Sequence, residues 1–170
     1  MKIIITGPES TGKSTLVEEL STFYGVNPVD EYARNYLINQ KGTYVYDDLL
    51  AIAKQQQYAI IEATEKGGLV ISDTDLLTIK IWSNVKFGRC EEWILEALKA
   101  NKPDLYLLCK PDIPWTPDPL RENPNDRAEL FDIYEKEILD LKVRYRVISG
   151  QTEARVQMGI NAIEELKNQI

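Results

Sequence analysis

The chain has 170 residues, of which 44% are hydrophobic, and a formal net charge of −7 with a sequence pI near 4.8. This length suits a single domain over residues 1–170, and the acidic charge argues against a broad nucleic-acid surface. With no His, two widely separated Cys and no long apolar run, we expect a reduced cytoplasmic protein without a zinc-histidine site or a membrane partner.

A glycine-bounded loop follows the apolar segment at residues 2–6 and precedes a helical pattern. This is the context of a P-loop (Walker A motif), whose backbone N–H groups converge on phosphate oxygens. We expect Lys13 to reach the β- and γ-phosphates and Ser14 to coordinate Mg²⁺, while an ordinary helix-capping turn is the alternative. The expected ATP-binding residues are Gly7, Pro8, Glu9, Ser10, Thr11, Gly12, Lys13, Ser14 and Thr15.

The next segments predict further elements of an alternating fold. Leu16, Leu20 and Phe23 mark one face of a helix that ends at Gly25. Residues 27–30 predict a short second strand, and residues 32–39 predict a helix.

Charged residues follow the predicted second strand, in the run Asp30-Glu31-Tyr32-Ala33-Arg34. We expect them at the phosphate-facing edge of the sheet. Asp30 or Glu31 would then be the catalytic carboxylate that accepts a proton from an acceptor hydroxyl, and Arg34 would support a phosphate or an ion pair. A solvated first helical turn is the alternative.

A longer helix is predicted over residues 47–66, and a buried strand over residues 69–72. Asp73 follows that strand as a Walker B acid does, at the same sheet edge as Ser14, so we expect it to serve the metal. Three roles are open to Asp75: the metal, a substrate contact, or the cap of a following helix.

The C-terminal half predicts a helix at 91–100, a strand at 105–109, a helix up to Leu141, a strand at 143–148 and a final helix. Five strands then alternate with helices. This order predicts an α/β P-loop NTPase fold: a three-layer sandwich with a five-stranded, mostly parallel sheet and helices on both faces.

Five prolines make residues 111–127 a long nonhelical connection and a candidate lid over the substrates. Arg121 and Arg127 flank its acidic stretch, where they would close over phosphates as catalytic cations or remain solvated. Trp115 would stack on a flat substrate ring or anchor the loop to the core.

In combination, these motifs resemble the NadR-type nicotinamide riboside kinase domain over the whole chain; they are the P-loop, Glu31 to Arg34, Asp73-Thr74-Asp75, and Pro114-Trp115 with Asp118 and Arg121. The resemblance implies a nucleotide-kinase-like sheet and ATP-dependent phosphorylation of a ribosyl 5′-hydroxyl, forming nicotinamide mononucleotide in pyridine nucleotide salvage. A cationic pyridinium ring would lie over Trp115, and Asp30 or Asp118 would complement its charge or hold ribose hydroxyls. The DNA-binding and nucleotidylyltransferase modules of multifunctional members are not expected.

Other functions fit parts of the pattern. Residues 101–104 read Asn-Lys-Pro-Asp, as in the guanine-binding motif of GTPases, but they precede a strand and are interpreted as a turn. A regulatory ATPase module would use residues 111–125 to signal to a protein. A nucleoside monophosphate kinase would need added cations, such as Arg34, for its acceptor phosphate. The sequence does not indicate an oligomeric state.

Overall fold

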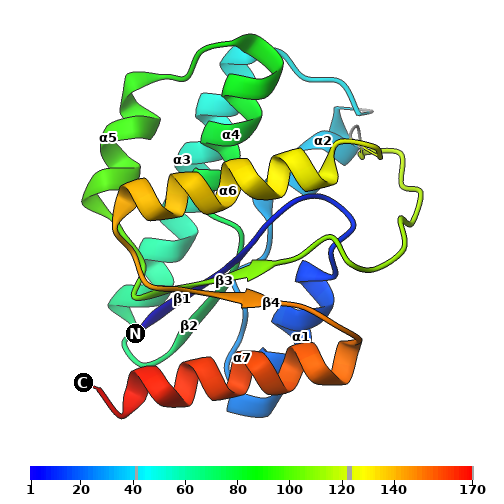
Figure 1. The fold of residues 1–170 in the computed structure, drawn as a ribbon. Helices are drawn as coiled ribbons and strands as arrows, with labels where there is room; N and C mark the ends of the chain where they lie inside the picture. The colour runs from blue at the N-terminus through cyan, green and yellow to red at the C-terminus, as the bar shows by residue number, and fades with distance from the viewer. Residues whose placement is uncertain (41, 122–123, 170) are drawn as a thin grey trace.

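A parallel sheet organises the molecule. The computed structural model describes residues 1–40, 42–121 and 124–169. Within these ranges the strands are β1 (Lys2–Thr6), β2 (Val70–Asp73), β3 (Leu105–Cys109) and β4 (Tyr145–Ile148), in the sheet order β2-β1-β3-β4. In the register, Ile4 lies between Ser72 and Tyr106. The carboxyl ends of all four strands therefore meet at one edge of the sheet (Figure 1).

The prediction of a second strand at residues 27–30, which would have made the sheet five-stranded, is wrong. Val29 makes only an isolated parallel bridge to Ser72, in which its N–H donates to Ile71 O and its carbonyl accepts from Asp73 N, both at 2.9 Å. Pro28 has no N–H to extend the ladder, and a helix begins at Tyr32, three residues after Val29. The described sheet has four strands, with this one bridge added at the β2 edge.

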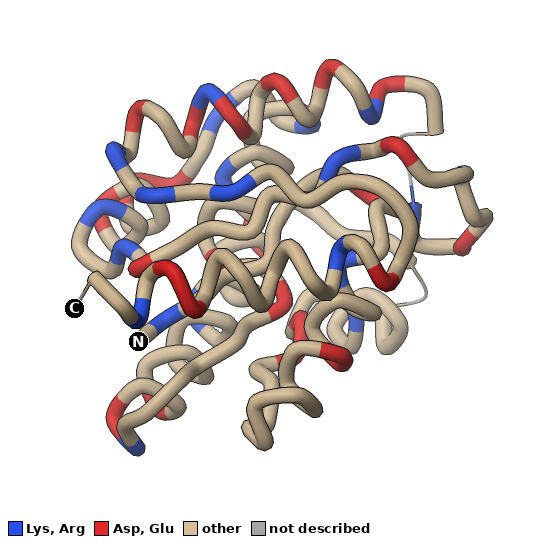
Figure 2. The backbone as a smooth tube through the Cα atoms, turned by 60° about the horizontal axis from the view of Figure 1, so that its bottom comes forward, with Lys and Arg blue, Asp and Glu red and all other residues tan. Residues whose placement is uncertain are grey.

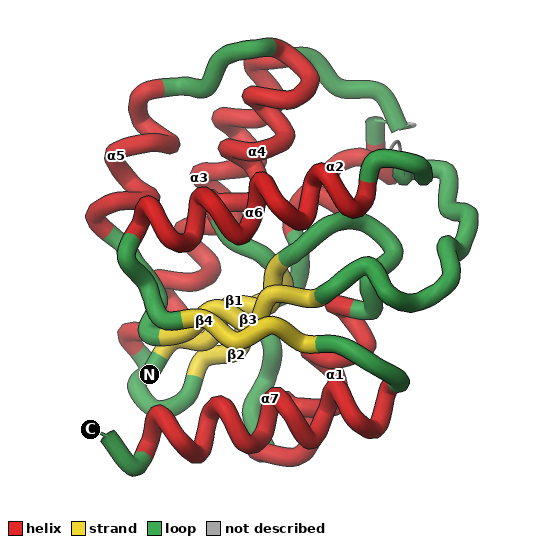
Figure 3. Tube along the Cα trace, viewed as in Figure 1, coloured by secondary structure: helices red, strands yellow, loops and turns green. Residues whose placement is uncertain are grey.

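Helices cover both faces of the sheet, as predicted (Figures 1 and 3). Helices α1 and α7 lie on one face, and α3, α4, α5 and α6 gather on the other. Their bounds are α1 (Lys13–Tyr24), α2 (Tyr32–Asn39), α3 (Tyr46–Glu65), α4 (Leu76–Phe87), α5 (Glu92–Ala100), α6 (Arg127–Leu141) and α7 (Thr152–Lys167).

Alternate residues of the central strand serve the two cores. Ile3 and Ile5 pack with Leu16 of α1 and Ile163 of α7, whereas Ile4 packs into the other cluster, which includes residues of α3 to α6. Successive strand side chains point to opposite faces, so this is the pattern expected of a strand buried on both sides.

The sequence pattern did not indicate helix α4. It buries Leu76, Leu77, Ile79 and Ile81 at successive or nearly successive positions, so it shows no single apolar stripe. The pattern also misplaced Phe23 in α1, whose side chain is 60% exposed and packs edge-on against its neighbour Tyr24.

The charges of the molecule are distributed over many elements. Figure 2 shows Lys and Arg interspersed with Asp and Glu along the helices. The acidic excess is therefore not gathered in one element.

None of the helices in the described ranges is long and apolar enough to cross a bilayer.

The turn at residues 101–104 lies at the amino end of β3, as interpreted from the sequence. The side-chain amide of Asn101 donates to Ala97 O at 2.8 Å, and Lys2 N donates to Asp104 Oδ2 at 2.6 Å. Both side chains hold local structure at the edge of the sheet opposite to the P-loop.

Gly7 occupies the tightest glycine position near the sheet edge. Its φ is 132°, and a Cβ added there would lie 2.7 Å from the carbonyl oxygen of Cys109. We expect Gly7→Ala to lower the free energy of unfolding by about 3 kcal/mol in urea titrations without nucleotide, since it combines backbone strain with overlap. Gly67→Ala is the matched control, because Gly67 also has a positive φ but no atom within 4 Å; it should cost about 1 kcal/mol. Equal losses would contradict the close approach of the loop to β3.

Candidate functional site

A cavity of about 420 Å³ lies at the carboxyl edge of the sheet. Residues 7–15, the complete set predicted to bind ATP, form one wall. Most of the remaining lining residues are apolar or aromatic, and they include Leu37 of α2, Ile81 and Trp82 of α4, and Tyr134 of α6. The cavity thus joins a phosphate-binding type of loop to a pocket suited to a flat organic group.

The P-loop has the backbone geometry of an anion nest. Gly7, Ser10 and Gly12 have positive φ values of 132°, 54° and 76°. Alternation of such residues with ordinary ones turns successive N–H groups to one side of the chain. Gly12 caps α1 without a side-chain hydrogen bond, so the N–H groups of the first turn are open to an anion.

Ser14 and Asp73, predicted as a metal pair from separate segments, are in contact. The Ser14 hydroxyl donates to Asp73 Oδ2 at 2.6 Å. The other carboxylate oxygen, Oδ1, is buried without a hydrogen-bond partner among the described residues. Burial raises the pKa of Asp73, although Lys13 and the Ser14 bond oppose this. A buried oxygen without a partner, beside a hydroxyl and an anion nest, fits Mg²⁺, which takes hard oxygen ligands.

Glu31 lines the cavity, whereas Asp30 is exposed and is not among the residues lining it. The buried amide of Gln56 holds the backbone on both sides of Glu31: it donates to Asp30 O at 3.2 Å and accepts from Tyr32 N at 2.8 Å. Burial, reinforced by the charge of Asp73, raises the pKa of Glu31 to about 7. A carboxylate with this pKa can exchange a proton near neutral pH.

Asp75 lies in the core and does not line the cavity. It caps α4 by accepting from Leu77 N at 3.0 Å, and its other oxygen accepts from Tyr106 OH at 2.6 Å. Burial raises its pKa to about 6. Of the three roles left open by the sequence, the geometry is that of the helix cap.

Trp115 also lies outside the cavity wall. The guanidinium carbons of Arg121 and Arg127 are 5.9 and 5.7 Å from the centre of its ring. The tryptophan therefore contacts cations of the loop and of α6, and its expected place over a substrate ring stays a prediction.

The loop after β3 crosses the P-loop. Thr116 N donates to the Ser10 hydroxyl at 2.8 Å. Arg121 donates to Thr116 O and lines the cavity, whereas Arg127 is not among the lining residues. The acidic stretch predicted between these arginines includes residues 122 and 123, which lie outside the described residues.

Arg34 and Asp118 form an ion pair between α2 and the loop. Arg34 Nη2 donates to Asp118 Oδ2 at 2.7 Å, and Asp118 Oδ1 accepts from Leu120 N at 2.9 Å. Arg34 holds the pKa of Asp118 below its usual range. Both were predicted substrate residues, and of the two only Arg34 lines the cavity.

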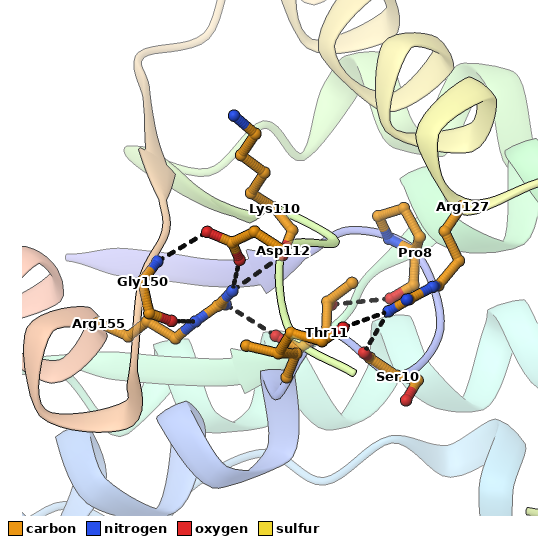
Figure 4. Close-up of polar contacts among 9 residues, drawn as sticks. Pro8, Ser10, Thr11, Lys110, Asp112, Arg127, Gly150 and Arg155 are labelled. Carbon is orange, nitrogen blue, oxygen red and sulfur yellow. Dashed lines mark hydrogen bonds and ion pairs between the residues drawn. The ribbon is translucent and has the colours of Figure 1, made fainter. Parts of the chain in front are cut away.

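Several residues of the site were not singled out from the sequence. Tyr44, Trp82 and Lys86 line the aromatic end of the cavity, with the Lys86 ammonium 3.7 Å from the centre of the Tyr44 ring. Trp82 and Lys86 belong to α4, the helix that the pattern missed. Arg155, at the start of α7, is 3% exposed and donates to P-loop Thr11 O (Figure 4). In the sequence, the only indication of a buried role for Arg155 was a charged residue beside the apolar positions of the last helix.

Comparison with known proteins gives similarities that span the chain. The trifunctional NAD biosynthesis/regulator protein NadR of Escherichia coli K12 is 25% identical over 172 residues, covering 96% of this chain and 42% of that protein. A crystal structure of NadR protein in complex with NR has a TM-score of 0.77 at 20% identity, covering 97% of this chain and 51% of that one. Another, in complex with NAD and AMP-PNP, has a TM-score of 0.76 at 21% identity, covering 98% and 49%.

The chain thus spans about half the length or less of these NadR proteins, and the structural similarity concerns the fold. The family model AAA_28, described as an AAA domain, matches residues 2–155, which include the P-loop, Glu31, Asp73 and the loop over them. Because this match covers most of the sequence, the chain belongs to the AAA_28 family of AAA domains.

Proposed function

We propose that this domain is a kinase that uses ATP and Mg²⁺ to phosphorylate the 5′-hydroxyl of nicotinamide riboside, giving nicotinamide mononucleotide for NAD biosynthesis. The observation that carries the proposal is that one cavity joins an anion nest and a carboxylate with a pKa of about 7 to an aromatic end. The similarity to NadR proteins in complex with NR, and with NAD and AMP-PNP, supports the choice of ligands.

The P-loop supports a nucleoside triphosphate as the donor. A smaller cavity of about 90 Å³ lies beside it, lined among others by Gly12, Thr15, Ile113 and Val156. Gly12 and Thr15 also line the large cavity, so a nucleotide with phosphates in the nest can place its base in the small one. Lys13, whose Nζ donates to Pro8 O at 2.7 Å, supplies a cation beside those phosphates.

Ser14 and Asp73 are the proposed holders of the magnesium ion. When bound, the ion would neutralise charge on the donor phosphates. The unpartnered Asp73 Oδ1 and the Ser14 hydroxyl are the oxygens available for this purpose. Binding would also satisfy a buried polar atom that the described residues leave without a partner.

Glu31 is the proposed base. In its ionised form it accepts the proton of the acceptor hydroxyl as the phosphoryl group is transferred. Arg121, which lines the cavity, would neutralise charge on that group. The flat pyridinium ring would occupy the aromatic end, formed by Tyr44, Trp82 and Tyr134.

A nucleoside monophosphate acceptor is less well supported, since Arg34, the cation expected to hold its phosphate, is paired with Asp118. A regulatory ATPase would not require an aromatic pocket that contains a general base such as Glu31. These alternatives predict different products.

An acceptor panel tests the proposed activity. With ATP and Mg²⁺, we expect formation of ADP and of a phosphorylated riboside in equal amounts when nicotinamide riboside is added, because the cavity binds both reactants. Common nucleosides and mononucleotides are the comparison acceptors, and products are measured by chromatography. ADP formation that ignores every acceptor would instead support the regulatory ATPase.

Replacing Glu31 with Gln tests the base. We expect kcat to fall roughly 10²- to 10⁴-fold while the Kd for ADP stays within about threefold, since a proton acceptor is lost but the nest remains. Wild-type kcat/KM, which reports titration of the free enzyme, should rise with pH through a midpoint near 7, and the variant should lose this dependence. Asp30→Asn, at the exposed neighbour, is the control and should keep the wild-type profile.

The same variant gives a stability readout whose sign is fixed. Folding raises the pKa of Glu31 from its ordinary value of 4.5 to about 7, so the folded protein retains a proton that the unfolded chain has lost between these pH values. Wild-type stability therefore falls across this window because of Glu31, and E31Q should gain relative stability from pH 4.5 to 7. A constant difference in urea denaturation would contradict the raised pKa.

Replacing Asp73 with Asn tests the metal site. Asn keeps the shape but removes the charge, so we expect the Mg²⁺ concentration required for half-maximal activity to rise roughly 10- to 100-fold. Asp132→Asn, at an exposed position of α6, is the matched control and should leave the requirement unchanged. An unchanged Mg²⁺ titration for D73N would remove Asp73 from the site.

A further inference from the structure

The P-loop has a second face whose polar groups also need partners. A loop that turns its N–H groups toward an anion exposes carbonyl oxygens on its outer side, and buried carbonyls require donors. Here Pro8 O accepts from the Thr11 hydroxyl at 2.8 Å. Ser10 O accepts from Arg127 Nη1 at 3.0 Å, and Thr11 O accepts from Arg155 Nη1 at 2.8 Å (Figure 4). Two guanidinium groups from distant helices thus hold consecutive carbonyls.

Arg155 joins the loops after three strands. Besides Thr11 O, it donates from Nε to Gly150 O at 2.8 Å and from Nη2 to Lys110 O at 2.9 Å. It also pairs with Asp112, whose other oxygen accepts from Gly150 N at 2.8 Å. Thr11 follows β1, Lys110 follows β3 and Gly150 follows β4. A lysine could not satisfy this set, because its donors radiate from a single nitrogen.

Arg127 supports the one non-glycine residue of the nest that has a positive φ. Its Nη1 donates to both Ser10 O and Ile113 O at 3.0 Å. Ser10 has a φ of 54°, a conformation that L-residues seldom adopt without support from their surroundings. The Ser10 hydroxyl, bound by Thr116 N, adds a second restraint. Ser10 is therefore held in its conformation from the loop above it and from α6.

We propose that Arg127 and Arg155 are positioning residues for the donor phosphates. By holding the Ser10 and Thr11 carbonyls outward, they keep the neighbouring N–H groups turned toward the cavity before the nucleotide binds. This inference rests on the part of the proposed function that places the donor phosphates in the P-loop. In this proposal Arg127 lies behind the P-loop, at the Ser10 carbonyl. The sequence analysis instead expected Arg127 to close over the phosphates as a cation of the lid or to remain solvated.

The proposal predicts a selective loss of donor binding. The acceptor end of the cavity is lined by side chains of α2, α4 and α6, whereas the hydrogen bonds of the two guanidinium groups described above go to the P-loop and to the segments after β3 and β4. We expect R127K and R155K each to weaken ADP binding about tenfold or more, measured by calorimetry, as expected for the loss of a charged hydrogen bond. Binding of nicotinamide riboside and its KM should change less than about twofold. Arg146→Lys, at an exposed arginine of β4, is the matched control and should bind ADP normally.

A double-mutant cycle with Ser10→Gly separates positioning from direct contact. Glycine adopts a positive φ without strain, so Arg127 should matter less when residue 10 is glycine. We expect R127K to weaken ADP binding less than about threefold in the S10G background. An equal loss in both backgrounds, or an equal loss of ADP and riboside binding, would overturn the proposal. Arg155 also lines the smaller cavity proposed for the base. The cycle at Arg127 is therefore the deciding test, including where R155K does not fold.

The outcomes also separate this proposal from the proposed function. A wild-type protein that binds ADP but phosphorylates no riboside would overturn the kinase assignment and leave the positioning roles intact. A wild-type kinase whose R127K variant binds ADP with unchanged affinity would do the reverse. A wild-type protein that does not bind ADP would overturn both.

Discussion

The pairing of β1 with strands on both of its sides places every other part of the site. Parallel register against β2 brings the end of β1 beside Asp73, and parallel register against β3 brings Gly7 against Cys109. The P-loop can begin there only because glycine leaves room for the carbonyl of Cys109. The loop then reverses into α1, which packs on the opposite face of the sheet from α3 to α6. Phosphate cradle, acid and overlying loop are therefore consequences of one strand order.

This strand order places two partly or largely buried carboxylates, Glu31 and Asp73, at the same edge of the sheet. Burial raises the pKa of both Glu31 and Asp73. The charge of Asp73 adds to the shift of Glu31, and the charge of Lys13 opposes the shift at both groups. The chain has no His, so a carboxylate whose pKa is raised to about 7 is a means of exchanging protons at physiological pH. Such a group lowers stability, and its retention in the cavity is the pattern expected where function and stability compete.

Much of the fold was predictable because its signals are local. The P-loop glycines, the apolar strands and the rule that parallel strands end at one edge together predicted the contact between Ser14 and Asp73. Helix α4 escaped because a helix buried on several sides loses its periodicity. The prediction of a second strand was wrong because Pro28 has no N–H with which to continue the ladder beyond the bridge at Val29. Which carboxylate enters the cavity depends on Gln56, a residue from another helix. The surroundings of Trp115 include one arginine from its own loop, Arg121, and one from α6, Arg127. Long-range contacts of this kind have no local signature.

The ion pair between Arg34 and Asp118 is a weak link between two parts of the site. It links α2 to the loop that crosses the phosphate cradle, yet the Arg34 side chain is 50% exposed to solvent. Exposed pairs of this type contribute only about 0–1 kcal/mol, and dissolved ions weaken them further. The ion pair therefore adds little to the stability of the fold. The hydrogen bond from Thr116 N to the Ser10 hydroxyl is a separate attachment of the same loop to the phosphate cradle.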